Sequence, residues 1–139
     1  GFLIRPLPTE GTFALGSRTH IRWTIMNGLQ VVAFVPLSII TPSLFSQAYY
    51  WLMGCSIGRG AQLTSVSLND AFQISVGDNA FIARHACING HILENIKGER
   101  HLVLAPVRVG EDAIIGPHTQ IYPGCEIGAG AVIAARAVL

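Results

Sequence analysis

The stretch VGEDAIIGPHTQIYPGCEIGAGAVI, residues 109–133, places a branched aliphatic residue at every sixth position. A helix buries a face with a period of 3.6 residues and a strand with a period of two, so neither element explains a period of six. A small residue comes four positions after each aliphatic, and glycine often follows the aliphatic directly. The repeat positions are Val109, Ile115, Ile121, Ile127 and Ile133, and Leu139 continues them.

A six-residue unit is explained by a short strand followed by a sharp corner. Three such units enclose a triangular prism whose interior receives the aliphatic side chains, and Gly, Asn or Asp at the corners tolerates left-handed backbone angles. Stacked coils then pair as parallel strands. A flat sheet with tight turns would instead show alternation with a period of two. The sequence therefore predicts a mostly β fold, a parallel β-helix.

Counting places about four coils in residues 55–139, beginning near Ile57, Val76, Val109 and Ile127. The insertion ENIKGERHLVLAPVR (94–108) interrupts the repeat and predicts a β-hairpin flap with Lys97-Gly98 near its tip. One interpretation of residues 94–108 is a neutral insertion, which the coils of a β-helix tolerate easily. The functional alternative is a flap that builds a site, because site residues concentrate on loops held by a rigid scaffold.

Residues 1–54 lack the repeat. Residues 1–16 predict an extended linker, and residues 17–54 predict a hydrophobic pair of helices. We expect Ser17 to cap the first helix, Pro36 to end it, and the second helix to span about residues 43–54.

No charged residue occurs from Trp23 to Gly58, a run long enough to cross a bilayer, which takes about 20 residues. Prolines and polar residues interrupt the run, so we do not expect one straight span. Arg18 and Arg22 precede it and aromatic residues lie near its end, as in interfacial anchors. The pair is expected either to associate with the cytoplasmic side of a membrane or to be buried against another domain.

The composition and net charge indicate which kinds of partner the chain is expected to bind. Net charge is +1, from nine basic and eight acidic residues, which gives no electrostatic case for nucleic acid. The three cysteines are far apart and odd in number, which predicts neither a disulfide framework nor a zinc site. Because no Met precedes Gly1 and the repeat reaches the last residue, we expect a piece of a longer parent chain with further domains.

The hexad repeat resembles the hexapeptide-repeat superfamily, and the resemblance implies a left-handed β-helix. That superfamily includes γ-class carbonic anhydrases with three histidine ligands. Pro117 and Tyr122 occupy the positions of two of those ligands, so we expect no metal. His118 lies one place away from a ligand position and is expected to be a corner residue that faces solvent.

The segment from INGHILEN (88–95) onward resembles small O-acetyltransferases. Their Thr-x-x-His, Pro-Val-x-Ile-Gly and Pro-Gly-x-x-Ile-Gly motifs match here at His91, at PVRVG (106–110) and at PGCEIG (123–128). The resemblance implies that His91 is the general base in transfer of an acyl group to a hydroxyl or amine. The implied donor is coenzyme A or a carrier protein's phosphopantetheine thioester. Ile92 and Ile114 occupy positions where those enzymes usually have a proline and a tryptophan, respectively.

Further site residues follow from this chemistry. A neutral imidazole, with an ordinary pKa near 6.5, can accept a proton from the attacking group. His101 on the flap is a second candidate base, and Asp70 and Glu94 are candidates for orienting an imidazole. Backbone N–H groups at coil corners are candidates for holding the donor and the oxyanion. The cofactor-binding candidates among the corner residues are Gly110, Gly116 and Gly128.

A second resemblance covers most of the chain. It is to the carboxy-terminal repeat domains of nonribosomal-peptide-synthetase-like proteins of the ε-poly-lysine synthetase type. It is carried by Arg22-Trp23, MGCSIGRG (53–60), Asp70 with ISVGD (74–78), NGHILEN (89–95) and PVRVG (106–110). It implies membrane-bound domains that handle a carrier-tethered aminoacyl thioester and an amine acceptor. Asn95 replaces an expected acidic residue.

Two functions remain open on the sequence. One is an acyltransferase with His91 as base and the flap shaping its pocket. The other is a non-catalytic β-helix module that scaffolds, anchors or oligomerises a larger synthetase, as a homotrimer or a tandem pseudo-trimer. The repeat fits both functions, whereas His91 beside the flap favours the enzyme.

Overall fold

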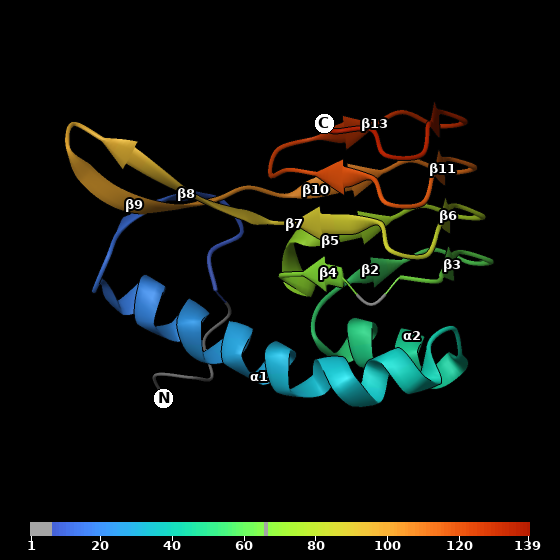
Figure 1. Cartoon of the computed structure of the whole chain (residues 1–139), viewed down its shortest axis with the longest axis horizontal. Helices are drawn as coiled ribbons and strands as arrows, with labels where there is room; N and C mark the ends of the chain where they lie inside the picture. The colour runs from blue at the N-terminus through green and yellow to red at the C-terminus, as the bar shows by residue number, and fades with distance from the viewer. Residues whose placement is uncertain (1–6, 66) are drawn as a thin grey trace.

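The computed structural model describes residues 7–65 and 67–139. Figure 1 shows a column of stacked strands, two helices across its base and a hairpin sheet at one side. The first elements along the chain are β1 (Gly11–Ala14), α1 (Arg18–Ile40) and α2 (Leu44–Leu52). The lower column contains β2 (Ser56–Ile57), β3 (Gln62–Leu63), β4 (Ser67–Asn69), the 3-10 turn η1 (Ala71–Gln73), β5 (Ile74–Val76), β6 (Phe81–Ile82) and β7 (Cys87–Asn89). The hairpin and upper column contain β8 (His91–Ile96), β9 (Glu99–Leu104), β10 (Val107–Val109), β11 (Ile114–Ile115), β12 (Gln120–Ile121), β13 (Glu126–Ile127) and β14 (Val132–Ile133).

The column is made of three parallel ladders, with strand orders β13-β10-β5-β2, β14-β11-β6-β3 and β12-β7-β4. The repeat aliphatics are in register from one strand to the next, as the pairs Ile82↔Ile115 and Ile88↔Ile121 show. These four side chains are fully buried. The predicted mostly β stack with inward aliphatics, preceded by two helices, is confirmed.

The corners of the column contain residues whose backbone angles lie in the left-handed region. Asn79 and Asp112 have φ of 56° at the same corner of two stacked coils, and asparagine and aspartate adopt this region more readily than most residues. His118, which was expected to face solvent at a corner, has φ 58° and is exposed. Its ring stacks on that of His85, with centroids 4.9 Å apart.

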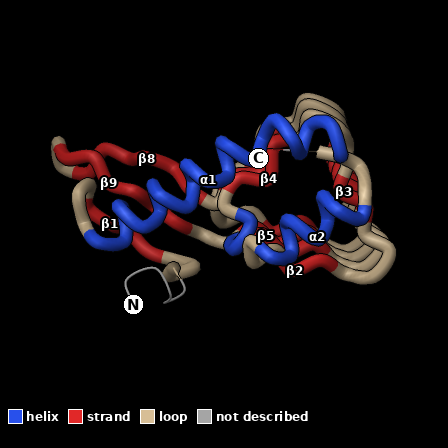
Figure 2. The backbone as a smooth tube through the Cα atoms, turned by 90° about the horizontal axis from the view of Figure 1, so that it is seen from below, coloured by secondary structure: helices blue, strands red, loops and turns tan. Residues whose placement is uncertain are grey.

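The helices lie across the base of the column, as Figure 2 shows from below. Ser17 caps α1 as predicted, because its side chain accepts a hydrogen bond from His20 N at 3.2 Å. The prediction that Pro36 ends this helix is wrong, since α1 continues to Ile40. Pro36 lies on the exposed side, while the following turn is held by Leu37, which is 3% exposed beneath the column.

The inserted flap is a hairpin, as predicted, but it begins at His91 rather than at residue 94. Lys97 and Gly98 form its turn with φ of 51° and 83°, which fits a two-residue turn with left-handed residues. Residues 11–14, expected to belong to a linker, form β1 and pair antiparallel with β9. This sheet packs on α1 through a small core that contains Trp23, Leu102 and Leu104.

Candidate active site

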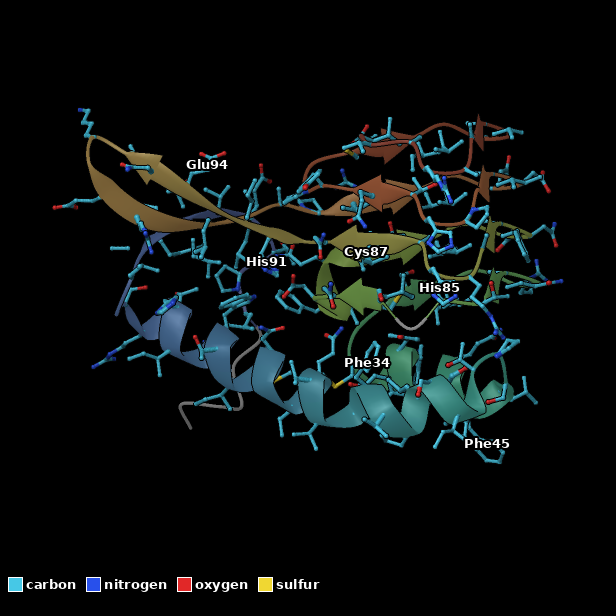
Figure 3. The ribbon with its side chains drawn as sticks, viewed as in Figure 1. Phe34, Phe45, His85, Cys87, His91 and Glu94 are labelled. Atoms are coloured by element: carbon cyan, nitrogen blue, oxygen red, sulfur yellow. The ribbon has the colours of Figure 1, made fainter. Side chains whose placement is uncertain are left out.

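The candidate site lies at the corner where the β12-β7-β4 ladder passes to the β13-β10-β5-β2 ladder. Asp70 follows β4, and His91 opens the hairpin after β7 and Gly90. The two side chains form an ion-pair contact between His91 Nδ1 and Asp70 Oδ2. The Asp70 side chain is 3% exposed and that of His91 is 24% exposed. In Figure 3, His91 lies above α1 at the point where the hairpin leaves the column.

Asp70 is held by two side chains of α1. Trp23 Nε1 donates to Asp70 Oδ1 at 2.7 Å, and Asp70 N donates to Gln30 Oε1 at 3.3 Å. Gln30 Nε2 also donates to the carbonyl oxygen of Leu68 at 2.7 Å. Both carboxylate oxygens therefore have partners, which offsets the cost of burying the charge.

A carboxylate at Nδ1 defines the role of the His91 ring. In the neutral imidazole, Nδ1 then carries the proton and Nε2 is left as the acceptor, because the partner of one ring nitrogen fixes the tautomer. The ring meets Trp23 edge-on, with centroids 4.6 Å apart and planes at 62°. This arrangement can accept a proton at Nε2 and stabilise the resulting imidazolium through Asp70.

Gly90 lets the backbone before His91 approach Asp70 and Gln73. A Cβ at this glycine would lie 2.6 Å from Gln73 Cβ and 3.1 Å from Asp70 Cβ. Gln73 is 3% exposed, and neither polar atom of its amide has a hydrogen-bond partner among the described residues. The Gln73 amide is therefore a buried polar group beside the Asp70–His91 pair whose partner the described residues do not supply.

Three residues of the site were not identified as site residues from the sequence. Gln30 and Gln73 carry no motif, and the only sequence signal for Trp23 was its place in an Arg-Trp pair. A polar side chain in an apolar helix, such as Gln30, is the kind of signal that points to a buried partner.

Glu94 and His101 lie apart from the Asp70–His91 pair. They are cross-strand partners, as are His91 and Leu104. Side chains alternate between the faces of a strand, so Glu94 and His101 lie on the opposite face of the hairpin from His91. His101 Nδ1 instead lies 3.1 Å from the carbonyl oxygen of Glu99. The structure brings together His91 and Asp70 and separates the other two candidates from them.

The candidate donor-binding glycines have different surroundings. Gly110 and Gly128 line a pocket on the β13-β10-β5-β2 ladder, next to the exposed Arg108–Glu126 ion pair at 2.7 Å. Gly116 is buried at another corner. A Cβ at Gly110 or Gly116 would lie 2.6 Å from a backbone nitrogen of the next coil, so packing alone requires glycine at both positions.

The buried Cys55 and the partly buried Cys87 are not activated nucleophiles. Burial raises the pKa of the Cys55 thiol to about 12. Burial also raises the pKa of the Cys87 thiol, and a hydrogen bond with Asn89 opposes part of that shift. Both thiols are therefore protonated at neutral pH, whereas the thiolate is the nucleophilic form. Across residues 7–65 and 67–139, no group of three or more His, Cys, Asp or Glu side chains could hold a metal ion.

Comparison with known proteins bears on the upper column. Residues 106–139 match the family model described as bacterial transferase hexapeptide (six repeats). No curated protein matches the chain, so the narrower resemblance to nonribosomal-peptide-synthetase-like proteins gains no support from the comparisons. The family match and the in-register ladders support a relation of this chain to the hexapeptide-repeat superfamily.

Proposed function

We propose that the chain is an acyltransferase domain in which His91 is the general base. The observation that carries the proposal is the His91–Asp70 pair, whose second carboxylate oxygen is held by Trp23 Nε1 at 2.7 Å. A partly exposed imidazole bonded to a buried, fixed carboxylate is a common arrangement for removing a proton from an attacking group.

In the proposed reaction, His91 Nε2 takes the proton of a hydroxyl or amine as that group attacks the thioester carbonyl carbon. The C–S bond then breaks, the acyl group stays on the acceptor, and the proton passes from His91 to the leaving thiolate. Asp70 stabilises the imidazolium between these two transfers.

The proposed donor is coenzyme A or a carrier protein's phosphopantetheine, placed along the pocket that contains Gly110 and Gly128. The order of motifs shared with ε-poly-lysine synthetase-type domains supports an aminoacyl group and an amine acceptor as the narrower proposal. A left-handed β-helix of about four coils is the scaffold proposed for this chemistry, on the strength of the superfamily match.

The test measures release of free thiol from acyl- and aminoacyl-thioester donors, together with the mass of the product. His91→Ala should lower kcat by about 10²–10⁴-fold, the usual contribution of a general base. Asp70→Asn should lower it by a smaller factor, because the ring loses its orienting charge. His101→Ala is the matched control, since this histidine lies on the other face of the hairpin, and it should retain turnover.

Circular dichroism and thermal melting must show that the variants remain folded. Wild-type turnover in His91→Ala, or an equal loss in His101→Ala, would refute the assignment of His91 as the base.

A non-catalytic scaffold is the second proposed function, and one observation favours it. Ile114 and Val132 are cross-strand partners on the outer side of one ladder, and they are 44% and 70% exposed. Such a strip can pack against a second prism. Sedimentation velocity of Val132→Lys tests this function, since loss of an oligomer would support it and an unchanged monomer would contradict it.

A further inference from the structure

We propose that the outer face of α1 and α2 docks on the surface of a membrane that contains anionic lipids, with α1 lying parallel to the bilayer. This face, called here the basal platform, points away from the column (Figures 1 and 2). Its exposed apolar side chains include Val32, Ile39, Leu44, Phe45, Trp51 and Leu52, which are 65–83% exposed. The proposal does not depend on the catalytic assignment.

The spacing of residues in α1 separates the platform from the buried face. Trp23, Gln30 and Leu37 are the buried residues of the helix and stand seven apart, on the side that faces the column and hairpin. Two residues further along an α-helix is about 200° around its axis. That rotation places Val32 and Ile39, which are 77% and 78% exposed, on the opposite side of α1. The helix therefore has one face fixed to the protein and one apolar face without a partner among the described residues.

The charges around the platform select anionic headgroups. The sequence has no Asp or Glu between Glu10 and Asp70, and its charged residues in that interval are Arg18, Arg22 and Arg59. Arg18 begins α1, and Arg59 lines a pocket against Trp51 of α2. The exposed Asp78 accepts a hydrogen bond from Arg59 N at 2.8 Å and is an acidic neighbour of the platform from the next coil. Apolar side chains accompanied by arginines, in a segment (residues 11–69) without acidic residues, fit a lipid surface of negative potential.

Contacts of the opposite face favour an in-plane helix over a crossing one. By length and composition, α1 is the one helix of residues 7–65 and 67–139 that could cross a membrane. Crossing would break the bond between Trp23 Nε1 and Asp70 and the bond between Gln30 Nε2 and the carbonyl oxygen of Leu68. It would also leave the polar groups of Gln30 without partners in hydrocarbon. Docking along the platform keeps all of these contacts. Figure 3 places Phe45 on the underside of α2, away from the column.

The first test measures binding of the 139-residue chain to vesicles of phosphatidylcholine alone and of phosphatidylcholine with phosphatidylglycerol. Val32→Glu and Val138→Glu form a matched pair, because both valines are exposed (77% and 68%) but Val138 lies in the last coil, where it pairs with Gln120, away from the platform. We expect Val32→Glu to weaken binding to the mixed vesicles by about tenfold or more and Val138→Glu to leave it unchanged.

The second test examines the electrostatic part of the proposal. Arg18→Gln with Arg59→Gln should weaken binding to the mixed vesicles by about fivefold per charge, whereas Arg136→Gln in the upper column should not. Raising the salt concentration should weaken binding of the unmodified chain.

The third test distinguishes lying from crossing and uses the two tryptophans of the chain. Trp51 is 65% exposed on the platform, whereas Trp23 is 8% exposed beneath the hairpin. Brominated lipids should quench Trp51 fluorescence in the unmodified chain and should leave the remaining Trp23 signal intact in Trp51→Phe. Quenching of Trp23 in that variant would show an inserted helix and would overturn the in-plane orientation.

Other outcomes also contradict the proposal. Equal binding to both kinds of vesicle would refute the anionic selectivity. An equal effect of Val32→Glu and Val138→Glu on vesicle binding would show that the platform does not contact the membrane. If the chain binds neither vesicle but forms a dimer that Val32→Glu dissociates, the platform is covered by a second copy and the membrane proposal is wrong.

Discussion

Asp70 is fixed by side chains that are distant from it in the sequence. Trp23, 47 positions earlier, donates to one carboxylate oxygen, and His91, 21 positions later, contacts the other. Asp70 has φ 62°, a left-handed value that aspartate tolerates, and its carboxylate turns toward these two partners rather than capping η1. The position of the His91 ring therefore depends on α1 as well as on the hairpin.

Trp23→Phe tests this dependence. The phenyl ring keeps an aromatic contact near His91, but Asp70 Oδ1 loses its donor. Loss of a hydrogen bond to a buried charged group should lower the free energy of unfolding by about 1–3 kcal/mol, as measured by urea denaturation. Trp51→Phe at an exposed position should change it by less than about 0.5 kcal/mol. If the two variants are equally stable, the Trp23–Asp70 bond has no role in holding the carboxylate.

Gly90→Ala should be destabilising because the added methyl has no room. Its Cβ would lie 2.6 Å from Gln73 Cβ and 2.7 Å from Gln73 Cγ. Overpacking of this kind costs about 1–3 kcal/mol, which thermal or urea unfolding can measure. Gly128→Ala is the matched control, since no described atom outside its chain neighbours lies within 4 Å of the corresponding Cβ. If Gly90→Ala leaves the free energy of unfolding unchanged, the corner relaxes around the added methyl group and close packing does not fix Asp70.

Which residue would partner His91 could not be predicted from the sequence. Asp70 and Glu94 were equal candidates, because both are carboxylates within reach of a corner. The hairpin begins at His91, and a shift of its start by one residue would move every side chain to the other face. The pairing of Glu94 with His101 across the strands thus follows from a register that no local pattern specifies.

At the scale of secondary-structure elements, local sequence rules explain where the helices are capped but not how far α1 extends or why β1 forms. Ser43 forms a capping box with Ser46 at the start of α2, and a signal of this kind is readable from the sequence. The continuation of α1 past Pro36 depends instead on Leu37, which is buried beneath the column. Strand β1 has no periodicity of its own and exists because it pairs with β9, a contact between residues about ninety positions apart in the chain.

Leu102→Ala should loosen the hairpin sheet without unfolding the column. Leu102 is fully buried in the small core with Trp23, and large-to-small changes at such sites cost about 2–5 kcal/mol. Hydrogen exchange of the peptide 91–104 should become faster while that of residues 107–121 stays slow. Leu93→Ala, at a residue that is 53% exposed on the same hairpin, is the control and should leave exchange nearly unchanged. Equal effects of the two variants would show that the small core does not hold the hairpin.

At the scale of the whole molecule, the column and its attachments differ in how far the sequence predicts them. The period of six could be read from residues 109–133 because each unit repeats the same local geometry and contacts only its neighbours. The arrangement of α1 beneath both the hairpin and the column is specific to this chain and involves Trp23, Gln30 and Leu37 as separate contacts. The seven-residue spacing of these three residues identifies one face of α1 but not the elements that this face contacts.

Stability along the column should follow the burial of successive coils. Ile115 is fully buried in the third strand of its ladder, and Ile127 is 7% exposed, whereas Ile133 at the top is only partly buried. Since each coil contacts only its neighbours, a change at the top removes fewer contacts than the same change in the middle. Ile115→Ala should therefore cost about 2–5 kcal/mol in urea denaturation, and Ile133→Ala clearly less. Hydrogen exchange should likewise be slowest in β6 and β11 and fastest in β14. Equal costs at the two positions would mean that the column unfolds as one cooperative block in which burial at the top matters as much as burial in the centre.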